Sequence, residues 1–134
     1  MPTLTRWFIK AALVSLVLGL AAGIWQQVPG ANAVGMFPVY LHLLTFGWLT
    51  QLIFGIAIWM FPMYSKEQPR GPEWIGWSVF AALNVGLLLR VIFEPLQSFS
   101  PTVSGGWALV ASAILQWLAG VGFAAAIWRR IRGK

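Results

Sequence analysis

Few side chains in this sequence could carry out chemistry. The chain has one histidine, His42, no cysteine, no aspartate and three glutamates. Without cysteine, thiolate catalysis, disulfides, iron–sulfur clusters and cysteine-based zinc sites are excluded. So few carboxylates leave little scope for general acid–base catalysis, and we therefore favour a non-enzymatic protein. His42 is the only obvious metal ligand.

His42, Arg90 and Glu94 are the ionisable residues within apolar sequence. Arg90 and Glu94 are four residues apart, on one face of a predicted helix. They either neutralise each other, or Arg90 holds an anionic group such as a cofactor carboxylate while Glu94 orients it. His42 is either a hydrogen-bonding core residue or an axial ligand of heme iron. Thr45, about one turn away, could contact the same site, and Met36 is a weaker candidate for a sixth ligand.

The composition indicates that lipid surrounds these residues. Hydrophobic residues make up 59% of the 134 residues and charged residues 9%, against about 25% in soluble domains. A membrane-spanning helix needs about 20 apolar residues, and four segments qualify, at residues 7–25, 37–61, 74–93 and 107–128. We predict a single all-α domain over residues 1–134, a four-helix transmembrane bundle with connectors of about ten residues. The predicted helix-breaking residues are Pro29, Gly30, Pro62, Pro69, Gly71, Pro72, Pro95, Pro101, Gly105 and Gly106.

The positions of the basic residues predict the orientation of these spans. Eight of the nine Lys and Arg residues lie on one side of the predicted membrane spans. They are Arg6 and Lys10 at the first span, Lys66 and Arg70 between the second and third spans, and Arg129, Arg130, Arg132 and Lys134 after the fourth. The positive-inside rule therefore places both termini in the cytoplasm, and His42, Arg90 and Glu94 near the outer leaflet. Topology explains the net charge of +6, so we expect no nucleic-acid partner, although the basic tail could also attract anionic lipid.

The N-terminal segment imitates a signal peptide. Two basic residues, an apolar run and the triplet Ala31-Asn32-Ala33 follow one another as in a cleavable leader. The apolar run is longer than in most leaders, so we interpret it as a retained first span.

Small and polar residues within the spans predict helix packing. Small residues recur every four positions at Gly19 and Gly23, at Ser78, Ala82 and Gly86, and at Gly120 and Ala124. Such spacing lets helices approach closely, within one chain or between chains. Gln51, Asn84, Ser112 and Gln116 are further polar candidates, and we expect Asn84 and Gln116 to bridge helices.

The sequence around His42 resembles a known family. It reads Tyr40-Leu-His42-Leu-Leu-Thr-Phe-Gly47-Trp48-Leu-Thr-Gln51-Leu-Ile-Phe-Gly55 and continues to Met60-Phe61-Pro62. This resembles the second transmembrane helix of heme–copper oxidase subunit I, particularly in cbb-type oxidases and nitric oxide reductases. It is most similar to short, four-helix homologues of that subunit. The resemblance covers about 25 residues closely and the four-span topology loosely.

The resemblance implies a cofactor. In the oxidases the corresponding histidine ligates a low-spin heme near the outer face, so His42 would bind a b-type heme. The other candidates for contact with the cofactor are Arg90, Glu94, Thr45 and Trp48. The family arranges twelve helices in three arcs of four, which implies that a four-helix chain forms a homo-oligomer such as a trimer. The additional histidines of the oxygen-reducing centre are absent here, and two-histidine ligation would need a second chain.

Three functional hypotheses follow. The first is a b-type heme protein of a prokaryotic inner membrane that serves electron transfer, gas binding or sensing. The second is a non-enzymatic structural or assembly subunit of a respiratory complex, without its own cofactor. The third, a small multidrug-type transporter, requires a membrane-embedded carboxylate, for which Glu94 is the only candidate.

Overall fold

Four long helical segments make up the protein. The computed structural model describes residues 1–131, so Arg132 and Lys134 of the basic tail lie outside the described residues. The segments are α1 (Thr3–Gln27), a continuous second segment made of α2 (Met36–His42), η1 (Leu43–Thr50) and α3 (Gln51–Met60), then α4 (Glu73–Phe99) and α5 (Val103–Trp128). Each is long and apolar enough to cross a membrane. The predicted all-α, four-helix transmembrane fold is confirmed, and the chain is a multi-pass membrane protein.

The third connector differs from the prediction. Only residues 100–102 separate α4 from α5, whereas we expected about ten residues. Pro95 lies inside α4, and Gly105 and Gly106 lie in the first turns of α5, so none of these three residues breaks a helix here. Proline is tolerated in membrane helices because neighbouring helices, Ser and Thr side chains, waters and small changes of helix geometry satisfy the backbone groups that it frees.

Side chains close this short turn. The Gln97 side chain donates from Nε2 to the Thr102 carbonyl at 3.0 Å and accepts at Oε1 from the Thr102 backbone N–H at 2.7 Å. The Thr102 hydroxyl accepts from the Gly105 backbone N–H at 3.1 Å. Thr102 is therefore the N-cap of α5, and it satisfies a donor that would otherwise lack a partner.

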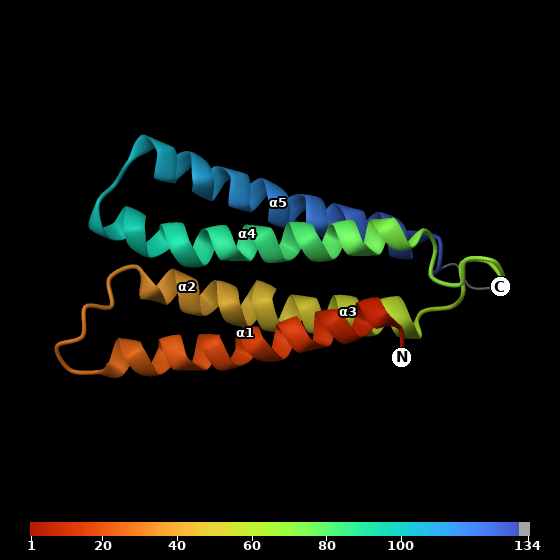
Figure 1. The fold of residues 1–134 in the computed structure, drawn as a ribbon, viewed down its shortest axis with the longest axis horizontal. Coiled ribbons are helices and arrows are strands. Elements are labelled where there is room, and N and C mark those ends of the chain that lie inside the picture. The colour runs from red at the N-terminus through yellow and green to blue at the C-terminus, as the bar shows by residue number, and fades with distance from the viewer. Residues whose placement is uncertain (132–134) are drawn as a thin grey trace.

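The helices form two hairpins that lie side by side (Figure 1). In the first, α1 packs along α2, η1 and α3, and in the second, α4 packs along α5. The hairpins meet chiefly where α2 and η1 lie against α4. Within residues 1–131, the backbones of α1 and α5 do not approach each other closely, and only side chains lie between these two helices. The N-terminus and the end of α5 lie at the same end of the molecule (Figure 1).

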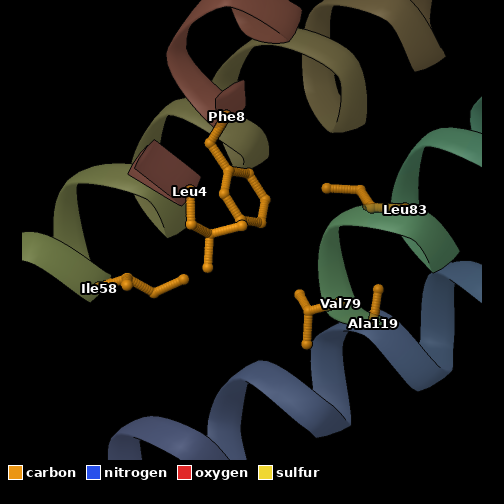
Figure 2. Packing of buried hydrophobic residues seen from close by; sticks show 6 residues of the cluster. All are labelled: Leu4, Phe8, Ile58, Val79, Leu83 and Ala119. Carbon is orange, nitrogen blue, oxygen red and sulfur yellow. The ribbon is translucent and has the colours of Figure 1, made fainter. Parts of the chain in front are cut away.

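Two apolar clusters hold the hairpins together. The larger consists of Leu4, Phe8, Ile58, Val79, Leu83 and Ala119, which approach one another from both hairpins (Figure 2). The smaller consists of Val39, Leu43 and Leu87, with Met36 and Val91 packed against it. Between 22% and 33% of the most apolar part of each span is buried inside the molecule. The remaining apolar surface faces outward, as expected for contact with a lipid bilayer.

The small-residue motifs of α1 and α4 pack within the chain. A Cβ added at Gly19 would lie 2.9 Å from the Leu44 side chain, and one at Gly23 would lie 3.0 Å from Tyr40. On α4, Gly86 packs against Ser112 and other residues of α5. These faces are therefore used for contacts inside each hairpin, whereas an added Cβ at Gly120 would meet nothing within 4 Å.

Candidate functional site

His42 stands at the end of α2, where it faces α4. Its Nδ1 atom lies 2.7 Å from the Pro38 carbonyl oxygen and 3.3 Å from Glu94 Oε1. The imidazole also stacks on Phe46, with ring centroids 5.9 Å apart. Because both neighbours of Nδ1 are oxygen acceptors, we assign the ring hydrogen to Nδ1. In neutral imidazole this leaves a lone pair on Nε2, the arrangement found in histidines that ligate a metal.

Glu94 joins His42 to Arg90. Arg90 donates from Nη1 to Glu94 Oε1 at 2.9 Å, and the Glu94 side chain is only 7% exposed. The ion pair that the four-residue spacing predicted is therefore formed. Glu94 additionally contacts His42 on the neighbouring hairpin, a contact that no spacing within one helix could predict. We call these three residues, His42, Arg90 and Glu94, the His42 cluster.

Two polar atoms of the His42 cluster have no partner. Arg90 Nε and Glu94 Oε2 are both buried, and neither forms a hydrogen bond to any described residue. Nearly all buried polar atoms in proteins are paired, so each exception calls for a water, an ion or a ligand. The cluster thus retains one donor and one acceptor beside the histidine.

Thr45 and Trp48 do not join the cluster. Thr45 is exposed, and its hydroxyl donates to the Leu41 carbonyl of its own helix at 2.7 Å. Trp48 is half-buried and forms no hydrogen bond or aromatic pair with the part of the chain that is described. Their contact with a cofactor stays a prediction.

The π-helical segment η1 explains why Thr45 turns away. It begins directly after His42, and its wider turns change which residues lie above one another along the helix. His42 and Thr45 are three residues apart, and such positions share a face in an α-helix but separate when the turn widens. Phe46 is four residues from His42 and still stacks on it. π-Helical turns occur frequently at functional sites.

Gly47 lies at the centre of η1, where neighbouring helices approach from two sides. A Cβ added there would lie 2.7 Å from Ser15 of α1 and 2.9 Å from Leu87 of α4. Both distances are shorter than any van der Waals contact allows, so only glycine fits this position without movement. Gly47 thereby holds α1 and α4 close to η1, one turn beyond His42.

A hydrogen-bond network at the start of α3 joins the second helical segment to α4. Gln51 is fully buried, donates to the Gly47 carbonyl at 2.9 Å and accepts from Asn84 Nδ2 at 3.0 Å. The predicted bridging role of Asn84 is therefore confirmed. Gln116 differs, because its buried Nε2 lacks a partner among residues 1–131, and Ser112 instead bonds to the Gly86 carbonyl at 2.7 Å. Sequence reasoning named Gln51 only as a weak candidate and gave no signal for Pro38.

Other features bear on what the His42 cluster could hold. Met36 packs with the smaller apolar cluster. No group of three or more His, Asp or Glu side chains suited to a metal ion occurs within the described chain. His42 lines neither the cavity beside Arg130, nor that beside Tyr40, nor that beside Gln68. Comparison with protein-family models, curated proteins and solved structures finds no match to this chain.

Proposed function

We propose that this chain binds a b-type heme through His42 and serves electron transfer, gas binding or sensing. The observation that supports the proposal most is the tethering of Nδ1 by the Pro38 carbonyl and Glu94. Axial histidines almost always donate their other ring N–H in this way, which orients the ring and raises its basicity. The resemblance of residues 40–62 to an oxidase heme helix points to the same residue.

The residues around His42 fit such a group. Arg90 Nε is a buried donor without a partner, and arginine suits the carboxylate of a heme propionate. Glu94 would hold both Arg90 and the imidazole in position. A bound heme would supply an iron that changes oxidation state or binds a gas. In this proposal His42 would ligate the iron, Glu94 would orient the imidazole, and Arg90 would neutralise a propionate.

The proposal includes a homo-oligomer. The His42 side chain is partly exposed and lines none of the three cavities named above, so the cofactor would be shared with a second copy. The sequence has one histidine, so two-histidine ligation would need the imidazole of a second copy. A trimer that imitates the twelve-helix oxidase subunit is the arrangement implied by the family resemblance.

We further propose a prokaryotic inner membrane as the location, with both termini in the cytoplasm. The described cations outside the His42 cluster lie before or near the start of α1, between α3 and α4, or after α5, and the loops at residues 28–35 and 100–102 carry no charge. This asymmetry satisfies the positive-inside rule.

An absorption spectrum tests the heme proposal. The full chain, expressed with heme supplied and purified in detergent, should show a Soret band. The heme-to-chain ratio would be one for a single imidazole ligand or one-half for a heme shared by two copies. His42→Gly should lose the band, and added imidazole should restore it, because the free ligand can occupy the space of the missing ring. Leu49→Ala, at an exposed position of η1 that is not among the cofactor candidates, serves as a nearby control.

Three results would overturn the proposal: no Soret band in the wild-type protein, a band unchanged in His42→Gly, or equal loss in Leu49→Ala. Circular dichroism of each variant distinguishes loss of the ligand from loss of the fold. Recovery with imidazole separates a ligand from a packing residue, since only a ligand can be replaced in solution.

The alternative is a structural or assembly subunit of a respiratory complex without its own cofactor. It is favoured by the contact between His42 and Glu94, which joins the two hairpins. In that case His42→Gly would lower stability, the wild-type protein would carry no heme, and the chain would co-purify with larger partners.

A further inference from the structure

A cavity of about 440 Å³ lies between the two hairpins, at the end of the molecule opposite the His42 cluster. Its walls come from the start of α1, the end of α3, the start of α4, the end of α5 and the loop between α3 and α4. Its volume falls within the roughly 300–1,000 Å³ of typical ligand sites. It is thus large enough for a ligand and distinct from the proposed heme site.

One part of the cavity is apolar. Leu4, Ile58 and Val79 of the larger cluster line it, together with Phe123 and Ala126. Figure 2 shows Leu4 and Ile58 on one hairpin and Val79 on the other, on opposite sides of the space between them. This part therefore borders the buried cluster at which the two hairpins meet.

The other part of the cavity is cationic. Arg70, Arg129 and Arg130 line it, with Glu73 as the one carboxylate among the lining residues. Glu73 is 73% exposed, and its contact with Arg70 is long, at 3.5 Å. Arg129 donates to the Tyr64 hydroxyl at 2.9 Å, which places a second polar group at the same entrance.

Arg130 is buried and structural. It donates from Nε to the Pro62 carbonyl at 2.8 Å and from Nη2 to the Ile58 and Phe61 carbonyls at 3.0 and 2.6 Å. These bonds cap the C-terminus of α3, whose last carbonyls lack helical partners. They provide no negative charge, and burial together with the charge of Arg70 lowers the pKa of Arg130. The cationic part therefore has more positive charge than its own residues neutralise.

We propose that this cavity binds one anionic phospholipid, with the phosphate between Arg70 and Arg129 and an acyl chain in the apolar part. An anion with an apolar tail matches both parts of the cavity, whereas a free phosphate matches only the cationic part. A membrane provides such a ligand at the level where a ring of cations meets the apolar helices. Binding fills the cavity between the hairpins and adds to the link that Arg130 already makes between the ends of α3 and α5.

Native mass spectrometry of the full chain tests this proposal. The protein in detergent is offered equimolar palmitoyl-oleoyl phosphatidylglycerol and phosphatidylcholine. We expect one phosphatidylglycerol per chain, retained in preference to phosphatidylcholine. Each cation near a lipid surface contributes about fivefold in affinity, so Arg70→Gln/Arg129→Gln should weaken phosphatidylglycerol binding about 25-fold. Arg6→Gln/Lys10→Gln removes the same charge from outside the cavity lining and should change binding about twofold or less.

A second pair of variants tests the acyl chain. Ala126→Phe fills the apolar part and should abolish lipid retention, whereas Ala124→Phe, on an exposed position outside the lining, should not. Inorganic phosphate and the headgroup glycerophosphoglycerol serve as probes without an acyl chain. Neither should raise the melting temperature as phosphatidylglycerol does.

Several outcomes would overturn the proposal. Equal retention of both lipids would remove the anionic preference, and full stabilisation by inorganic phosphate would assign the site to a free anion. Unchanged binding in both Arg70→Gln/Arg129→Gln and Ala126→Phe would place the lipid elsewhere. If the double variant does not fold by circular dichroism, Arg70→Gln alone decides, because the described contacts of Arg70 are confined to the protein surface.

Discussion

Replacing Glu94 with leucine should reveal the energetic role of the His42 cluster. Glu94 Oε1 accepts from Arg90 at 2.9 Å and lies 3.3 Å from His42, and the carboxylate is only 7% exposed. Glu94→Leu leaves the Arg90 guanidinium, itself 21% exposed, without its counter-charge. Breaking a buried ion pair from one side costs about 3–5 kcal/mol, and the partial exposure of Arg90 favours the lower end, about 3 kcal/mol.

The double variant Arg90→Met/Glu94→Leu gives the sharper comparison. It removes both charges and keeps apolar volume, a change that is often neutral or stabilising for a buried pair. We therefore expect the double variant to be about 2–3 kcal/mol more stable than Glu94→Leu alone. An ordinary hydrogen bond between membrane helices contributes only about 0.6 kcal/mol, so a difference this large identifies an uncompensated charge.

Unfolding of the detergent-solubilised chain by sodium dodecyl sulfate, followed by far-ultraviolet circular dichroism, measures these free energies. Glu73→Leu is the matched control, because its pair with Arg70 is exposed and 3.5 Å long, and it should cost less than about 1 kcal/mol. A double variant less stable than Glu94→Leu would refute this reasoning. So would a cost for Glu94→Leu no greater than that for Glu73→Leu.

Three further predictions use the same protein. Gly47→Ala should lower the free energy of unfolding by about 1–3 kcal/mol in the same assay, because the added methyl group overpacks the helix contacts. Gly120→Ala, whose added methyl group meets no neighbour, should be neutral or stabilising. Equal effects of the two substitutions would contradict the packing described. Gln97→Ala should lower stability by about 1–2 kcal/mol by opening the turn before α5, and an unchanged midpoint would show that the turn closes without it. The chain has no cysteine, so single-cysteine variants can report the topology. An impermeant maleimide added outside spheroplasts should label Asn32→Cys and not Ser65→Cys. The reverse labelling pattern would show the opposite orientation.

The spans were predictable because a bilayer imposes one length on every helix. Each predicted span overlaps its helix closely, although α4 and α5 extend further at the end where they are joined. The error at Pro95 arose because rules for helix-breaking residues derive from proteins in water. In lipid, a helix that stops leaves carbonyl and N–H groups without partners, so it continues past the proline.

The candidate site was predictable only in part. Arg90 and Glu94 pair through their spacing along one helix, which the sequence reveals directly. The contact of His42 with Glu94 depends on how two hairpins pack, which no local pattern contains. Thr45 was expected beside His42 from α-helical spacing, and the π-helical turns of η1 rotate it away.

The short connection between α4 and α5 has a consequence for how the protein enters the membrane. Only three residues, Ser100, Pro101 and Thr102, join the two helices, and none is charged. In the orientation proposed above, moving them across the hydrocarbon layer requires no desolvation of a charge, and the Gln97 side chain already satisfies two backbone groups of Thr102. We therefore expect α4 and α5 to insert together as a preformed pair, with the ion pair of Arg90 and Glu94 carried across as one neutral unit.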